Sequence, residues 1–149
     1  MLYTDLRRGR ASIGGQIYLV TTVVHDREPL FTSLYFGRLV VRTLYRAEMA
    51  VRATTLAYVI MPDHLHWLLQ LHTGHTLSTV VWSVKGRSAF DINRARGTRG
   101  AVWQPSFHDH ALRKEEDLQS VARYVVCNPL RARLVRSIYD YSLWDAIWM

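Results

Sequence analysis

The sequence of 149 residues is poor in cysteine and lacks long apolar runs. Its single cysteine, Cys127, excludes a disulfide within the chain and a zinc site built from cysteines. Nowhere do 18 apolar residues follow one another, and the charged residues 1–10 are not followed by the apolar core of a secretion signal. We therefore expect neither a membrane-spanning helix nor an exported protein, and the reducing cytoplasm is the expected location.

Internal repeats and low-complexity linkers are also missing, which favours one folded domain over residues 1–149. Hydrophobic residues make up 49% of the chain and charged residues 21%, proportions that are typical of globular proteins. Nineteen Lys and Arg outnumber twelve Asp and Glu, giving a formal net charge of +7. This excess favours a polyanionic partner, although many basic proteins bind none. We expect a basic N-terminal arm over residues 1–15 and a basic, aromatic tail over residues 130–149.

The sequence is organised around residues 58–72, where two apolar runs of strand length meet at the turn-forming dipeptide Pro62-Asp63. This pattern predicts a hairpin of a strand over residues 53–61 and a strand that begins at His64. The period of two puts His64, His66, Leu68 and Gln70 on one face of that strand, and Leu65, Trp67, Leu69 and Leu71 on the other. Two adjacent imidazoles suit one metal ion, but half-buried histidines that only bond to their neighbours are the alternative.

The remaining patterns predict a mixture of strands and helices. They indicate strands over residues 16–24 and 103–112, and helices over about residues 33–52, 77–95 and 115–127, the last one ending at Asn128-Pro129. This order predicts the α+β class, with a ferredoxin-like antiparallel sheet and helices packed on one face.

The third predicted helix contains two residues with possible chemical roles. Tyr124 and Asn128 are four residues apart, so they lie one above the other on a helix. Tyr124 offers a phenol, and Asn128 offers an amide oxygen that a hard cation accepts. Alternatively, Tyr124 packs in the core beside Val121 and Val125, and Asn128 only ends the helix.

Four motifs in a fixed order resemble those of the HUH single-tyrosine transposases. They are Val-Ile-Met-Pro-Asp-His-Leu-His (residues 59–66), Val-Trp-Gln (102–104), Phe-His-Asp-His-Ala-Leu-Arg (107–113) and Ala-Arg-Tyr-Val-Val-Cys-Asn-Pro-Leu-Arg-Ala-Arg-Leu-Val (122–135). Within that group the chain is most similar to the REP-associated tyrosine transposases, over nearly its whole length. The resemblance implies a nucleoid-associated enzyme that recognises a DNA hairpin and cuts and rejoins single-stranded DNA.

The resemblance also assigns roles to residues of this chain. His64 and His66 match the metal-binding pair, Tyr124 the nucleophile, and Asn128 a third, amide-oxygen ligand for Mg²⁺ or Mn²⁺. Some relatives have glutamine at that last position, so direct contact and contact through water are both open. Attack by Tyr124 on a phosphate would release a 3′-hydroxyl and leave a 5′-phosphotyrosine link. The relatives include monomers and homodimers, so the tyrosine could act on the metal of either subunit.

His108, Asp109 and His110 have two interpretations. They could orient the metal ligands, transfer protons or bind phosphate, or they could form a polar surface at the end of a strand. A structural zinc ion would need a fourth ligand such as His108 or His110, which would suit a small zinc protein that binds RNA. Another alternative is a non-catalytic DNA-hairpin-binding protein derived from a transposase.

Arginine and lysine residues are the candidates for DNA contacts, because phosphate contacts dominate affinity. Tryptophans could stack on bases or pack in the core. The candidates for phosphate contacts are Arg7, Arg8, Arg10, Lys85, Arg87, Arg131, Arg133 and Arg136, and those for stacking are Trp82, Trp103 and Trp144.

Overall fold

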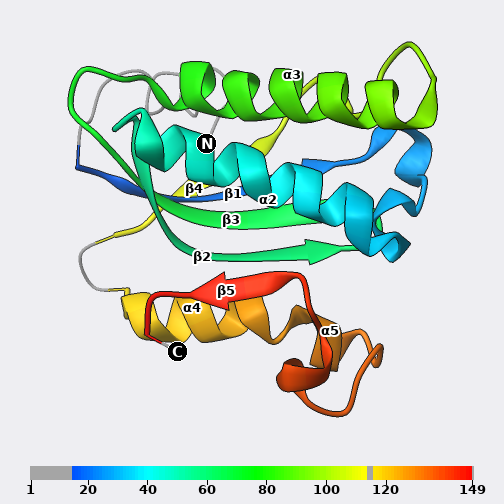
Figure 1. The fold of residues 1–149 in the computed structure, drawn as a ribbon. Helices are drawn as coiled ribbons and strands as arrows, with labels where there is room; N and C mark the ends of the chain where they lie inside the picture. Colours follow the sequence, from blue (N-terminus) through cyan, green and yellow to red (C-terminus); the bar gives the residue numbers. More distant parts are fainter. Residues whose placement is uncertain (1–14, 114–115, 149) are drawn as a thin grey trace.

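Five antiparallel strands form one sheet in the order β4-β1-β3-β2-β5 (Figure 1). The computed structural model describes residues 15–113 and 116–148, so the predicted contacts of Arg7, Arg8 and Arg10 lie outside the described residues. The strands are β1 (Ile17–Val23), β2 (Ala53–Met61), β3 (His64–Leu71), β4 (His108–Ala111) and β5 (Trp144–Ala146).

The hairpin of β2 and β3 has the predicted two-residue turn, because Met61 pairs directly with His64 across Pro62-Asp63. The predicted division of the two faces of β3 is also confirmed. Leu65, Trp67, Leu69 and Leu71 belong to the largest cluster of buried residues, whereas Leu68 belongs to a cluster on the opposite face.

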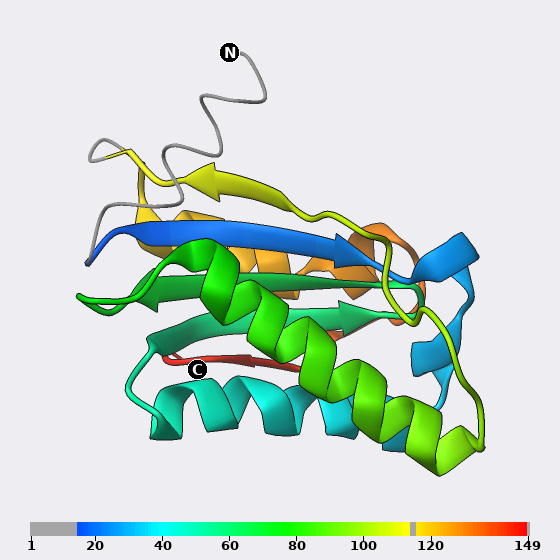
Figure 2. The same cartoon turned by 90° about the horizontal axis from the view of Figure 1, so that it is seen from above.

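Helices α2 (Leu34–Met49) and α3 (Leu77–Arg96) cover the face of Trp67 (Figure 2). Each begins at a hydroxyl side chain, Ser33 or Thr76, that accepts a hydrogen bond from the backbone N–H three residues later. α3 ends at Gly97, whose φ of 68° is the left-handed conformation that glycine adopts without strain. Among the described residues, no helix has both the length and the hydrophobicity needed to span a membrane.

Helix α4 (Leu118–Val126) packs on the opposite face of the sheet (Figure 1). Its residues Ala122 and Val126 contact the cluster of Leu56, Ala57 and Leu68. The predicted α+β class with an antiparallel sheet is confirmed, but the expectation that all the helices share one face is corrected by α4. Helical periodicity identifies the buried side of a helix and does not say which sheet face that side covers.

The chain continues differently from the prediction after α4. Asn128-Pro129 does not end the helical segment, because a short helix α5 (Asn128–Arg131) follows at once. Pro129 is tolerated there because its missing N–H would have no partner in a first turn. The tail then adds the unpredicted strand β5 to the free edge of β2. The described residues also form three 3₁₀ turns: η1 (His25–Arg27), η2 (Leu30–Thr32) and η3 (Ile138–Asp140).

Strand β4 is shorter than predicted, because the segment before it packs as a loop. Trp103 forms an isolated bridge with Val24, is buried, and donates from Nε1 to the Ser88 hydroxyl at 2.9 Å. It is therefore a core residue and is not available to stack on bases.

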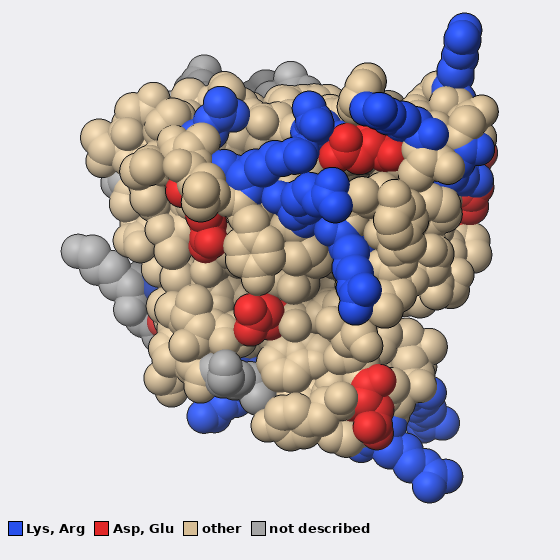
Figure 3. Space-filling view, viewed as in Figure 1, with Lys and Arg blue, Asp and Glu red and all other residues tan. Residues whose placement is uncertain are grey.

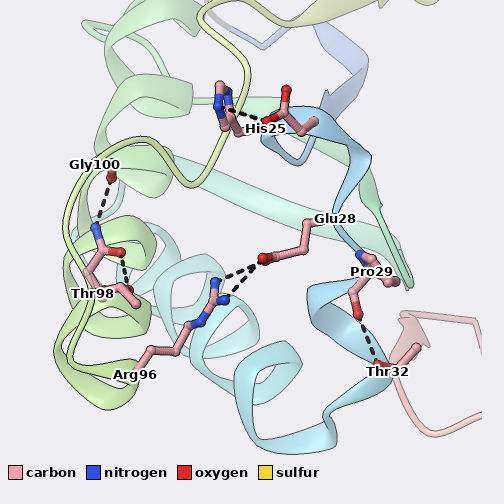
Figure 4. Close-up of polar contacts among 9 residues, drawn as sticks. His25, Glu28, Pro29, Thr32, Arg96, Thr98 and Gly100 are labelled. Carbon is pink, nitrogen blue, oxygen red and sulfur yellow. Dashed lines mark hydrogen bonds and ion pairs between the residues drawn. The ribbon is translucent and has the colours of Figure 1, made fainter.

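The C-terminal end of α3 is fixed to the segment that follows β1 (Figure 4). Both terminal nitrogens of Arg96 donate to the Glu28 carboxylate, at 3.0 Å each. A bidentate pair of this kind fixes orientation as well as distance. It holds the C-terminal end of α3 against the loop between β1 and α2.

Lys85 is buried inside the fold, on the sheet side of α3. Its ammonium donates to the carbonyls of Gln104 at 2.7 Å and Ser106 at 2.9 Å, and burial lowers its pKa to about 8. The prediction that Lys85 contacts DNA is therefore wrong. Its role is to hold the loop before β4 against α3.

We expect Lys85→Met to lower the free energy of unfolding by about 1–3 kcal/mol, because two carbonyls would lose their donor while the side-chain volume is kept. Urea unfolding measures this change. The exposed Arg94 of the same helix provides a control, since Arg94→Met also removes one positive charge and should change stability by less than about 0.5 kcal/mol. Equal effects of the two substitutions would contradict the structural role of Lys85.

Candidate active site

The two predicted metal ligands, His64 and His66, lie at the start of β3, where the strand leaves the hairpin turn. Their ring centres are 4.7 Å apart and their planes are nearly perpendicular, at 85°. Both side chains are half-buried on the sheet face that α4 covers. The hairpin therefore brings two imidazoles together at one edge of the α4 layer.

Each imidazole uses its Nδ1 atom in a hydrogen bond. His64 Nδ1 lies 2.6 Å from Asp63 Oδ1, and the other oxygen of Asp63 accepts from Arg27 at 3.2 Å. His66 Nδ1 lies 2.8 Å from the Thr21 hydroxyl. With Nδ1 protonated in both rings, both Nε2 lone pairs are left for a cation, as is usual for metal-bound histidines. This donor set fits a divalent metal ion.

Burial, together with the nearby His64 and Arg131, lowers the pKa of His66 to about 4. The ring is thus neutral at physiological pH. A histidine must be neutral to bind a metal, so His66 is in the ligating form without any proton loss.

Helix α4 is packed directly beside the two histidines. Val125 contacts Val59 and Met61, which are the cross-strand neighbours of His66 and His64 on the same face. Tyr124 precedes Val125 and is 62% exposed, so the alternative that it packs in the core is wrong.

Asn128, the first residue of α5, lies about one helical turn after Val125, the α4 residue that packs on the sheet. Its amide nitrogen donates to the Val125 carbonyl at 2.8 Å. Its amide oxygen has no hydrogen-bond partner within residues 15–113 and 116–148. This oxygen is therefore available as an acceptor or a ligand.

Arg131 connects the tyrosine with the histidines. Its guanidinium carbon lies 3.7 Å from the centre of the Tyr124 ring, and its Nη2 donates to the Tyr124 carbonyl at 2.6 Å. It also acts electrostatically on His66. Sequence reasoning proposed Arg131 only as a contact for DNA, because the short helix α5 that returns it to Tyr124 was not predicted.

A family model described as "Transposase IS200 like" matches residues 14–128. The chain belongs to the IS200-like transposase family. Two relatives are named as REP-associated tyrosine transposases. The Haemophilus influenzae protein is 25% identical over 138 residues, which cover 85% of this chain and 77% of that protein. The Escherichia coli protein is 23% identical over 128 residues, which cover 86% of this chain and 74% of that protein.

A solved structure of a REP-associated tyrosine transposase bound to a REP hairpin has a similar fold. The two structures match with a TM-score of 0.75 at 20% identity, over 91% of this chain and 79% of that chain. The predicted resemblance to the REP-associated tyrosine transposases is thus confirmed, together with the fold class.

The residues of β4 lie farther from the pair His64 and His66. His108 is opposite Thr21, which is opposite His66, so β1 separates the two histidines. His110 is exposed and pairs with Glu116 at 2.9 Å. The partly buried Asp109 is opposite Val20 of the α2–α3 core, and therefore lies on the other face.

A zinc site with His108 or His110 as a further ligand is not formed. In the part of the chain that the structure describes, no three His, Cys, Asp or Glu side chains gather closely enough to hold a metal. A structural zinc ion needs four such ligands, so the alternative of a small zinc protein loses its support.

The other predicted DNA contacts are exposed at separate places on the protein. Arg133 and Arg136 follow α5, whereas Arg87 lies on α3, where it pairs with Asp91 at 3.3 Å. Trp82 is half-exposed on α3. Trp144 is partly buried, and its Nε1 donates to the Ile138 carbonyl at 2.7 Å.

We expect the metal-free protein to lose stability as the pH falls from about 6.5 to about 4. Unfolded histidine takes up a proton near pH 6.5, whereas folded His66 does so only near pH 4, so the unfolded state binds more protons in this window. Urea unfolding in EDTA at several pH values measures the effect. His66→Asn, which retains a donor toward Thr21, should flatten this part of the profile; an unchanged slope in the variant would contradict the assignment.

Proposed function

We propose that this transposase cuts and rejoins single-stranded DNA beside hairpins, through a covalent link between Tyr124 and a 5′-phosphate. The main support is the position of an exposed phenol, held by a guanidinium, on the helix that packs beside two imidazoles with free Nε2 atoms. The REP hairpin bound to the structural relative supports a DNA hairpin as the partner.

The residues fit a Mg²⁺ or Mn²⁺ ion that His64 and His66 would hold through Nε2, with the amide oxygen of Asn128 as a third ligand, direct or through water. When bound, such an ion polarises the scissile phosphate and favours the deprotonated phenol. His66 needs no deprotonation to bind it, since the ring is already neutral.

The chain's own residues account for the transfer. The Tyr124 hydroxyl gives up its proton to water and its oxygen attacks phosphorus to form an O–P bond. The bond from phosphorus to the 3′-oxygen breaks, and the released 3′-oxygen takes up a proton from water. The bond energy is kept in the phosphotyrosine, so a 3′-hydroxyl can attack it in the reverse step without a nucleotide cofactor. Arg131 holds the ring from one face and offers its remaining N–H groups to the phosphate.

We expect wild-type protein with Mn²⁺ and a labelled hairpin oligonucleotide that has single-stranded flanks to form an adduct that survives denaturing electrophoresis. Tyr124→Phe should abolish this adduct, because phenylalanine has no oxygen to attack phosphorus. Tyr139→Phe is the matched control, since Tyr139 is also an exposed tyrosine, and it should form the adduct at the wild-type level.

Two results of this assay would contradict the proposal, each in a different way. Tight hairpin binding without an adduct in the wild type would identify a non-catalytic hairpin-binding protein. An adduct that persists in Tyr124→Phe would assign the nucleophile to another residue.

We expect Asp63→Asn to raise the dissociation constant for Mn²⁺ about 10-fold to 100-fold, because His64 would lose the carboxylate that orients its ring. Isothermal titration calorimetry of the full chain measures this constant. Asp26→Asn removes the same charge from an exposed carboxylate beside His25, and asparagine tolerates the positive φ at that position. If both variants bind Mn²⁺ equally well, Asp63 has no orienting role.

A further inference from the structure

Helices α2 and α3 present arginines on their outer surface, which we call the α2–α3 arginine surface. Residues four apart share one side of a helix, so the arginines of α2 form a single row about 12 Å long. Figure 3 shows Lys and Arg side chains gathered in a band over these helices. The surface consists of Arg38, Arg42 and Arg46 of α2, Arg52 just after it, and Arg87 and Arg94 of α3.

Acidic residues compensate only part of this charge. Asp91 of α3 pairs with Arg46 of α2 at 3.5 Å and with Arg87 of α3 at 3.3 Å, and so links arginines of the two helices. Arg38, Arg42 and Arg94 have no ion-pair partner among the described residues. Three exposed guanidiniums are therefore left for an external anion.

The groove between the two helices has the chemistry of a phosphate site. It encloses about 290 Å³, and its polar lining comes from Arg46, Arg52, Arg87, Thr43 and Ser83. Arg52 donates to the Ser83 hydroxyl at 3.1 Å, which holds its guanidinium at the wall of the groove. Among the described residues, none that lines the groove is aromatic, so the groove offers donors for phosphate but no platform on which an unpaired base could stack.

This surface is separated from the candidate active site by the thickness of the sheet. α2 and α3 cover one face, and α4, which carries Tyr124, covers the other (Figure 1). A polyanion on the arginines would therefore leave Tyr124 accessible. Regularly spaced guanidiniums on two rigid helices suit a stiff backbone with regular phosphates, and a row of 12 Å spans about three to four phosphates of one strand.

We propose that the α2–α3 arginine surface binds the sugar-phosphate backbone of duplex DNA. The identification of that duplex as the stem of a hairpin whose single-stranded flank reaches Tyr124 rests on the proposed function. The surface then sets the position of the paired DNA and reads no base sequence, because all its contacts are to phosphate.

The test uses the full chain and two labelled probes, a blunt duplex of about 20 base pairs and one of its strands alone. The triple variant R38Q/R42Q/R94Q removes the three unpaired arginines, and R99Q/R113Q/R123Q removes three exposed arginines elsewhere. Fluorescence anisotropy at several salt concentrations gives the affinity and the slope of its logarithm against the logarithm of salt concentration.

We expect the first triple variant to lose at least tenfold in duplex affinity at low salt, with the slope less negative by about 2 to 3, because each phosphate contact contributes about 0.9. The control triple variant should lose much less. Both variants should form the Tyr124 adduct on a short unstructured strand at the wild-type rate.

Two results would overturn the proposal: equal loss of duplex affinity in the two triple variants, which would indicate net charge alone, or an equal loss for the single strand in the first variant. If the wild-type protein forms no adduct at all, the proposed function fails. The duplex measurement still decides the role of the α2–α3 arginine surface in that case.

Discussion

The central strand β3 is fixed on all four sides, and the rest of the structure depends on this constraint. β1 and β2 pair with its two edges, α2 and α3 pack on one face, and α4 packs on the other. A strand in this environment cannot slide without exposing its apolar residues. The two imidazoles at its start therefore have one position relative to α4, and the polar contacts of their Nδ1 atoms then fix the directions of the rings.

The sequence predicted the elements whose formation depends on neighbouring residues. The alternation of residues after His64 predicted both faces of β3, and the Pro62-Asp63 dipeptide predicted its turn. The layer that contains α4 depends on contacts between residues far apart in the sequence, which periodicity does not report. β5 was missed for a related reason, since a strand of three residues has too little pattern of its own and forms because β2 has a free edge.

In the candidate site, too, the sequence predicted which residues share one side of a helix but not which side chains are exposed. Spacing predicted that Tyr124 and Asn128 share one side of a helix, but only the structure shows that Tyr124 is exposed and is not a core aromatic residue. Among the basic residues, composition could not distinguish Lys85, which the fold uses internally, from Arg131, which contacts the tyrosine. Every lysine and arginine has the same formal charge in a sequence. Only the surrounding structure distinguishes a buried side chain that links two segments from an exposed cation.

The two-residue turn between β2 and β3 has a consequence for how this family can change over time. Substitutions at the turn alter one side chain, whereas the gain or loss of a single residue there or early in β3 would reverse the direction of every side chain after it. His64 and His66 would then exchange places with the leucines and the tryptophan of the core. Functional descendants of this sequence should therefore vary in residue type around the turn while keeping its length, and changes of length should accumulate in loops that no strand register depends on.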